Sequence, residues 1–204
     1  MKKVFGLFGV LVLLASCSSS SSSIPSVSRV PSTEQIDLSG YWNDTDVRIV
    51  CESLINDCLN SPRVAQAIAA RGGKLPVVLV GSFRNESSEH IDTAIITSTM
   101  EVTIFNSGKL DFVAGGSTRI ELREERQDQQ TNASEATASR LANETGADFL
   151  LTGSVRTIID RAANQTVRTY FVFAEMTDIE TNARMWMAQN SEIKKVIVQP
   201  RYRP

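Results

Sequence analysis

A run of six consecutive serines, Ser18–Ser23, separates a short leader from the rest of the chain. The residues that follow, 24–36, continue with two prolines and further serines. Such a segment cannot bury enough apolar surface to offset the entropy lost on ordering. We therefore expect residues 17–36 to form a disordered tether, with an average reach of about 25 Å and a full extension of about 70 Å. Residues 37–204 are expected to form a single globular domain, since their number fits one core.

The residues before the serine run have the layout of a secretory signal. Two lysines precede an apolar run, Val4–Leu14, and small residues lead from there to Cys17. The apolar run is shorter than the roughly 20 residues that a transmembrane helix needs. The sequence Leu-Ala-Ser-Cys at positions 14–17 resembles a bacterial lipobox. An ordinary signal with an incidental cysteine is the alternative.

The lipobox resemblance implies that residues 1–16 are a signal peptide and that Cys17 is the lipidated first residue of the mature chain. A cysteine thiol is nucleophilic enough to take up a diacylglyceryl group as a thioether. Each buried methylene of the acyl chains contributes about 0.8 kcal/mol, so several chains on one cysteine give stable anchoring. Ser18 at the next position, in place of an aspartate, favours the outer membrane as the destination.

The charge and the residue inventory exclude several classes of function. Lys and Arg number 21 and Asp and Glu number 23, so the chain lacks the basic excess that is typical of nucleic-acid binding. One histidine and three cysteines are too few for the usual kind of zinc site or for a histidine-based nucleophilic site. We therefore expect no catalytic residues, no metal, no cofactor and no small-molecule substrate.

Helix start and stop signals recur along the expected domain. Capping residues at 43–46 precede an apolar stripe, and Ser61-Pro62 starts a second helix that stops at Gly72-Gly73. Further helices are expected at 90–106, at 118–130 and from Ser134 to Gly146. The apolar stripe has the spacing of one helix face and comprises Val47, Val50, Cys51, Leu54, Ile55 and Cys58.

Five segments have the pattern of strands. The expected strands are Val77–Val80, Leu110–Ala114, 148–158, 167–177 and 184–193, the last three joined by hairpin loops near 160–166 and 178–182. This order predicts an α+β fold with a small mixed, largely antiparallel sheet of four to five strands flanked by helices. Much of the core is expected from Phe149, Leu151, Val155, Tyr170, Phe171, Phe173 and Trp186.

Cys51 and Cys58 lie on one helix face but about 10 Å apart along its axis, which is too far for a disulfide. We expect two buried thiols, with an intermolecular or redox role as the alternative. His90 has Ser88, Glu89 and Asp92 as neighbours, but working triads are assembled from distant segments, so a helix start explains these residues better. The charged segment 119–130 predicts either a solvated helix face or a polar protein-binding surface.

Several phrases along the chain resemble the family of penicillin-binding protein activators known as the LpoB family. The phrases, in chain order, are Asp37–Gly40, Trp42–Asp46, Val80-Gly81, Arg84-Asn85, Ser87–Ile91, Asn106–Gly108, Arg123–Arg126, Asp128–Gln130, Gly146–Asp148, Leu151–Gly153, Ile179–Thr181 and Trp186. The resemblance implies a fold like the N-terminal domain of TolB. It also implies a non-catalytic lipoprotein of the outer membrane that faces the periplasm, where it binds and stimulates a class A penicillin-binding protein.

The contact with that partner is expected on a loop from Arg84-Asn85 to Glu89-His90, just past the end of a buried strand. Binding residues are commonly displayed on loops held by a rigid scaffold. Tyr170 is expected near this loop on the sheet. The alternative function is that of a structural or secretion lipoprotein of the outer membrane related to CsgG. A pore of that kind needs additional strands with strict outward apolar alternation, whereas the expected domain core uses all five strands.

Overall fold

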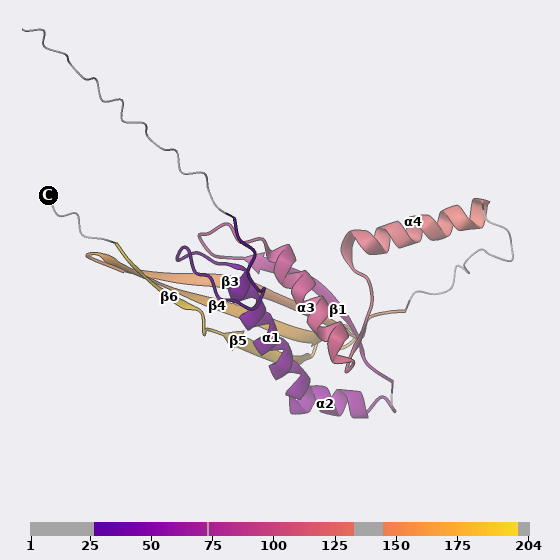
Figure 1. The fold of residues 1–204 in the computed structure, drawn as a ribbon. Helices are drawn as coiled ribbons and strands as arrows, with labels where there is room; N and C mark the ends of the chain where they lie inside the picture. Colours follow the sequence, from indigo (N-terminus) through magenta and orange to yellow (C-terminus); the bar gives the residue numbers. More distant parts are fainter. Residues whose placement is uncertain (1–26, 73, 133–144, 200–204) are drawn as a thin grey trace, which may run out of the picture. The chain divides into compact units, whose positions relative to one another are not determined.

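The computed structural model describes residues 27–72, 74–132 and 145–199 (Figure 1). The chain divides into a unit that ends at Ser32 and a unit that begins at Thr33, and all described helices and strands lie in the second. The expected signal peptide, Cys17, the serine run and most of the helix expected from Ser134 lie outside the described residues. None of the described helices has the length and hydropathy that a crossing of a bilayer requires.

Two helices open the second unit. Helix α1 (Asp44–Asn60) starts with a capping box, because Asn43 and Asp46 each accept a hydrogen bond from the backbone N–H of the other. Its buried face contains the whole predicted stripe, from Val47 to Cys58. Helix α2 (Pro62–Ala69) begins with the expected proline, whose missing N–H costs nothing at a helix start. Both predicted helices are confirmed, although α2 ends at Ala69, before the predicted stop at Gly72-Gly73.

The next two helices differ in how much of their surface they bury. Helix α3 (Thr93–Ser107) is capped by the Asp92 carboxylate and ends at Gly108, whose φ of 62° suits a residue without a Cβ. It buries one stripe of side chains against the sheet and α1. Helix α4 (Gly116–Asn132) buries none of its residues, which agrees with the polar helix predicted for 118–130.

Six strands form one sheet: β1 (Val77–Asn85), β2 (Asp111–Phe112), β3 (Phe149–Ala162), β4 (Gln165–Asp178), β5 (Arg184–Asn190) and β6 (Lys194–Val198). The order is β2-β1-β3-β4-β5, and β6 also pairs with β4. Strand β1 is parallel to β2 and β3, and the other pairs are antiparallel. The predicted α+β class with a mixed, largely antiparallel sheet is confirmed.

The sixth strand was not predicted: the strand expected over 184–193 ends at Asn190, and β6 lies beyond the expected segment, at Lys194–Val198. The Asn190 amide oxygen accepts a hydrogen bond from the Glu192 N–H at 3.1 Å, and its amide nitrogen donates to the hydroxyl of Ser53 in α1 at 3.1 Å. This turn ends β5. Strand β6 then pairs with Gln165–Thr169 of β4, while β5 pairs with Val172–Thr177 further along the same edge.

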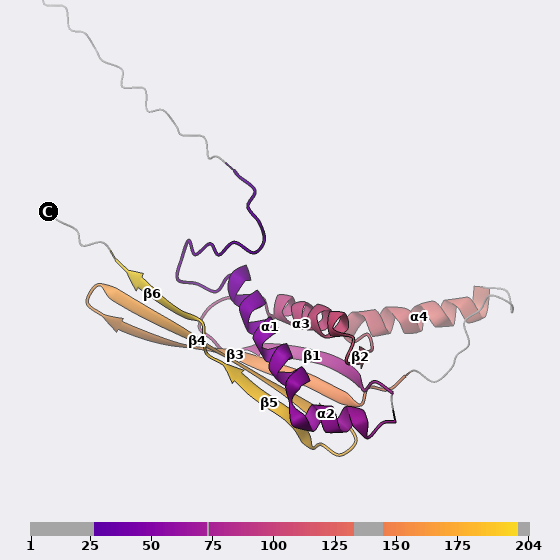
Figure 2. The same ribbon diagram turned by 60° about the horizontal axis from the view of Figure 1, so that its bottom comes forward.

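Helices α1 and α3 lie side by side over one face of the sheet (Figure 2), and α2 contacts β5. The alternation of side chains along β4 turns Tyr170 and Val172 toward this helix-covered face, where both are buried. Phe171 and Phe173 point to the opposite face and are only half-buried. Their assignment to the core was therefore wrong, because adjacent residues of a strand point to opposite faces of the sheet. The other five predicted core residues are buried.

Candidate partner-binding surface

The predicted binding loop begins later than the sequence indicated. Strand β1 continues to Asn85, so Arg84 and Asn85 belong to the strand. After an irregularity between Val80 and Phe83, the parallel pairing with β3 resumes and sets Asn85 opposite Val155. The Glu86 N–H then donates to the Val155 carbonyl at 2.8 Å. The connection between β1 and α3 is therefore residues 86–92.

The side chain of Asn85 shapes the start of this connection. Its amide oxygen accepts hydrogen bonds from the N–H and the hydroxyl of Ser87 at 3.0 and 2.7 Å. Its amide nitrogen donates to the Glu89 carbonyl at 2.7 Å. Hydrogen bonds between a side chain and nearby backbone groups stabilise a turn that lacks the regular backbone pairing of a sheet. Asn85 thus fixes the path of the backbone that carries Glu89 and His90.

Exposed charges surround the end of β1. The Glu86 carboxylate accepts a hydrogen bond from Arg156 Nε at 2.6 Å and lies 3.5 Å from Arg84 Nε. The side chains of Arg84 and Arg156 are 74% and 67% exposed. Exposed ion pairs contribute about 0–1 kcal/mol, so both guanidinium groups can exchange this carboxylate for another at little cost. His90 is also exposed, and the cap of α3 is Asp92.

A buried polar cluster lies beneath the exposed charges. The Tyr170 hydroxyl donates to Glu89 Oε2 at 2.7 Å, and Arg168 Nη1 lies 3.5 Å from Glu89 Oε1. The side chains of Glu89 and Arg168 are 5% and 10% exposed. A buried carboxylate is costly unless it is paired and hydrogen-bonded. Here Oε2 accepts the bond from Tyr170, whereas Oε1 has the ion pair with Arg168 but no hydrogen bond within the described residues. The connection 86–92 is thereby tied to β4.

The electrostatics of the cluster keep Tyr170 and Arg168 protonated. Burial and the hydrogen bond to Glu89 raise the pKa of Tyr170, so the phenol remains a donor. The pKa of Arg168 is also raised, chiefly by its interaction with the Tyr41 side chain and then by the Glu89 charge. The guanidinium group is therefore a permanent cation next to the carboxylate.

The segment just before α1 covers this cluster. The Tyr41 ring stacks on the Arg168 guanidinium group at 3.9 Å, and the Trp42 ring lies 5.2 Å from the Tyr170 ring. The Gly40 carbonyl accepts a hydrogen bond from Arg168 at 3.3 Å. A Cβ at Gly40 would overlap the side chain of Ile197 in β6, so only glycine lets the backbone pass so close.

Lys195 of β6 contacts the segment just before α1 and the first turn of that helix. Its ammonium group lies 2.9 Å from Asp37 Oδ1 and 2.7 Å from Asp46 Oδ2, and it donates to the Tyr41 carbonyl at 2.9 Å. Hydrogen bonds from Gln35, Lys195 and Asn43 lower the pKa of Asp37 to about 2. Asp46 behaves differently, because burial raises its pKa despite the nearby lysine.

The structure separates the predicted partner-binding residues into two groups. Arg84, Asn85 and His90 are exposed, whereas Glu89 is largely buried and Tyr170 is only 1% exposed. Tyr170 does lie at the loop, as expected, through its bond to Glu89. The two buried residues position the loop in this structure and do not offer their side chains to a partner.

Sequence reasoning missed Arg168, Lys195 and Arg156. Arg168 occupies the same strand face as the buried Tyr170 and Val172, so strand alternation could have marked it as a charged residue in need of a buried partner. Lys195 and Arg156 had no comparable signal, because their partners are far away in the sequence.

The two described cysteines are buried and not disulfide-bonded, as predicted. Burial raises the pKa of both Cys51 and Cys58 to about 12, so their thiols stay protonated at neutral pH. In residues 27–72, 74–132 and 145–199, no three His, Cys, Asp or Glu side chains are grouped closely enough to hold a metal ion.

The chain matches the model of the family described as peptidoglycan-synthase activator LpoB over residues 46–192. This match covers well over half of the chain, and the chain belongs to the LpoB family of peptidoglycan-synthase activators. The resemblance identified from the sequence phrases is confirmed.

Similar solved structures include the C-terminal domain of LpoB from Escherichia coli, with 16% identity, a TM-score of 0.44 and coverage of 71% of this chain and 96% of that one. The NMR structure of E. coli LpoB has 17% identity and a TM-score of 0.35, covering 97% and 94%. Lipoprotein GNA1162 from Neisseria meningitidis has 19% identity and a TM-score of 0.39, covering 59% and 83%. A search of curated proteins gave no match.

Proposed function

We propose that this chain is a non-catalytic lipoprotein of the outer membrane that binds and activates a class A penicillin-binding protein in the periplasm. The observation that carries the proposal is the match to the activator family over residues 46–192, which includes the end of β1, the connection 86–92 and the cluster beneath it. An activator acts by contact, so it needs a rigid surface and no reacting groups of its own.

The N-terminal sequence supports the proposed location. A lipobox at residues 14–17 would place acyl chains on Cys17, and the serine-rich residues after it would act as a spacer. We propose residues 1–16 as the signal peptide, 17–36 as the lipidated tether and 37–204 as the activating domain. A tether raises the effective concentration of a binding domain at its partner only if it is long enough to span the distance from the lipid anchor to that partner.

The end of β1 and the loop that follows are the contact surface that the geometry supports best. Arg84 and Arg156 are exposed, held loosely by Glu86 and displayed next to a loop that the Glu89 cluster keeps in place. Arginine is enriched among the few residues that dominate binding energy, because its planar group forms directed pairs with carboxylates. We propose Arg84, Asn85 and His90 as direct contacts, and Glu89 and Tyr170 as the residues that position them.

The experiment compares the affinity of the mature chain for a purified class A penicillin-binding protein before and after the substitution Arg84→Glu. We expect the dissociation constant to rise more than about fivefold, which corresponds to about 1 kcal/mol, with an unchanged melting temperature. Arg161→Glu, at the exposed far end of β3, makes the same change of charge and is the control. Equal affinities of the Arg84 and Arg161 variants would place the contact elsewhere, with the polar helix α4 as the next candidate.

A further inference from the structure

The edge of the sheet at β1 has no described strand paired with it beyond Val78, although the chain at Gly115 lies against Leu79 and Val80. Strand β2 pairs only with Val77 and Val78, and no other described strand lies against β1 on this side. Over residues 79–83 the strand has neither a proline nor a charged side chain, although the irregularity near Phe83 is one of the devices that protect exposed edges. An unpaired strand edge presents backbone donors and acceptors that another chain can take up.

A groove of about 480 Å³ runs along this open edge. The groove is lined by β1 from Val80 to Phe83, by the flank of α3 and by Gly115–Ser117. The α3 wall is formed largely by small side chains, including Ala94 and Ser98, which leave space for an incoming backbone. Glu101 is the charged residue that lines the groove, and it forms no ion pair in the described parts of the chain.

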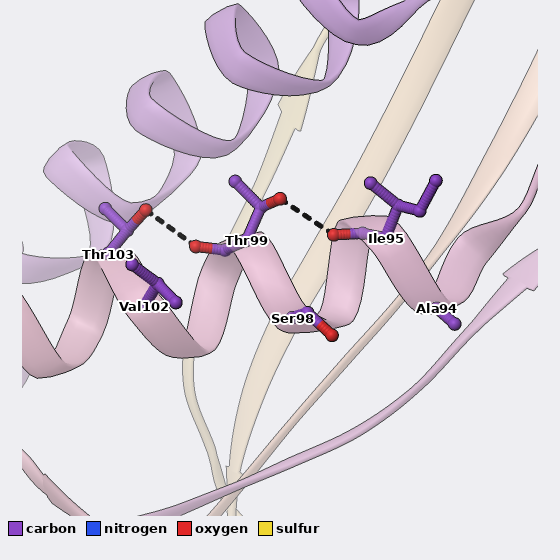
Figure 3. A pocket seen from close by; sticks show the side chains of 6 residues that line it. All are labelled: Ala94, Ile95, Ser98, Thr99, Val102 and Thr103. Carbon is purple, nitrogen blue, oxygen red and sulfur yellow. Dashed lines mark hydrogen bonds between the residues drawn. The ribbon is translucent and has the colours of Figure 1, made fainter.

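The adjoining surface of α3 is apolar despite its threonines (Figure 3). The hydroxyl of Thr99 donates to the Ile95 carbonyl at 2.8 Å, and that of Thr103 donates to the Thr99 carbonyl at 2.7 Å. The hydroxyls are thus turned to the backbone of their own helix. Ile95 and Val102 add exposed aliphatic groups, at 54% and 58% exposure. A neighbouring chain therefore meets mainly hydrocarbon on this helix.

We infer that this groove binds an extended segment of a partner protein, which joins the sheet as an additional strand beside β1. Main-chain hydrogen bonds to an open edge provide affinity, and pockets for alternate side chains provide specificity. Aliphatic side chains of the segment would pack against α3, and a lysine or arginine would face Glu101.

A second copy of this chain does not fit the groove equally well. The groove is lined by α3 and by Gly115–Ser117 as well as by β1, so a whole folded domain has less room at the edge than a single extended segment. A single extended segment can enter the groove from the open side. The groove lines β1 up to Phe83, so it adjoins the surface proposed for the synthase, which begins at Arg84.

The test uses the chain from residue 17 on, produced with Cys17→Ser, and a displayed library of random nine-residue peptides as the probe. We expect the selected peptides to share alternating aliphatic residues and one basic residue. Ser98→Trp fills the groove and should weaken their binding at least tenfold. Asn106→Trp, on an exposed position of the same helix outside the groove, should leave the affinity unchanged, with both variants checked by thermal melting.

Two further measurements define the mode of binding. N-methylation of successive backbone amides in a selected peptide should abolish binding at every second position, because alternate N–H groups of an added strand face its neighbour. Glu101→Lys should weaken peptides that carry a basic residue. The inference is overturned if no peptide is selected, if Ser98→Trp and Asn106→Trp bind equally, or if the methylation pattern lacks the period of two.

Discussion

The Tyr170 hydroxyl links strand β4 to the loop 86–92 through its hydrogen bond to Glu89. It donates to Glu89 at 2.7 Å inside a buried cluster, so Tyr170→Phe leaves the carboxylate without its shortest bond. We expect the free energy of unfolding to fall by about 1–3 kcal/mol, the cost of a buried group that loses its partner. Chemical denaturation of the wild type and the variant measures the difference.

The double variant Tyr170→Phe/Glu89→Gln provides the control for this prediction. If the two side chains act as a pair, the effects of the single substitutions on stability should not add, and the coupling should be at least about 0.5 kcal/mol. Additivity within experimental error would show that Glu89 does not depend on Tyr170, contrary to the role proposed for the pair.

A second residue, Asp37, predicts a dependence of stability on pH. Its pKa is lowered in the folded chain from 3.8 to about 2, so its contribution to stability is present above pH 4 and is lost as the pH falls toward 2. The effect should be small, since the side chain is 36% exposed and solvent screens its ion pair.

The measurement is the difference in unfolding free energy between the wild type and Asp37→Asn at pH 6 and at pH 2. We expect the wild type to be the more stable at pH 6 and the difference to shrink at pH 2. Asp160→Asn, an exposed position on β3, removes the same charge as a control. A difference that grows on acidification would mean that the segment before α1 is held by other contacts.

At the scale of secondary-structure elements, sequence patterns correctly predicted the features that depend on contacts between residues close together in the chain. The capping residues and apolar stripe of α1, the proline of α2 and the carboxylate cap of α3 all act within a few residues, and these helices lie where their patterns indicated. Strands β3, β4 and β5 were also predicted from the alternation of their side chains, although Phe171 and Phe173 show that alternation alone does not say which face is covered.

Long-range contacts decided the parts that the sequence did not reveal. Strand β1 extends to Asn85 because β3 offers it a partner, and β6 exists as a separate strand because Asn190 is held by α1. In the candidate site, the exposed residues could be predicted from their place near the end of a buried strand, although Arg84 and Asn85 still belong to that strand. The cluster beneath them joins residues up to 130 positions apart, and no local pattern reports such pairs.

The side chain of Asn190 offers a test at this scale. Asn190→Ala removes its bonds to Ser53 and to the Glu192 N–H, so we expect a loss of about 1 kcal/mol of stability and faster amide exchange in β6. Gln189→Ala, on the exposed neighbouring position, should change neither quantity. If both variants exchange at the rate of the wild type, the turn between β5 and β6 is held by other contacts.

For the whole molecule, the proposed anchor and the proposed contact surface should be separable. Cys17→Ala should leave an unprocessed or soluble precursor, detected by membrane fractionation.

Deletion of residues 18–28 should abolish function in cells but leave the affinity for the purified synthase intact, because a spacer contributes reach and no contact. Equal loss in both assays would show that the serine-rich segment is part of the interface.

The rate of glycan polymerisation by a purified class A penicillin-binding protein, with and without the mature chain, tests the central claim most directly. The account predicts a faster rate on addition of the chain and a higher half-maximal concentration for Arg84→Glu. For His90→Ala it predicts a rate at saturating concentration within about twofold of the wild type, since His90 is proposed as one contact among several and not as a reacting group. An unchanged polymerisation rate at a concentration where binding is saturated would contradict the account.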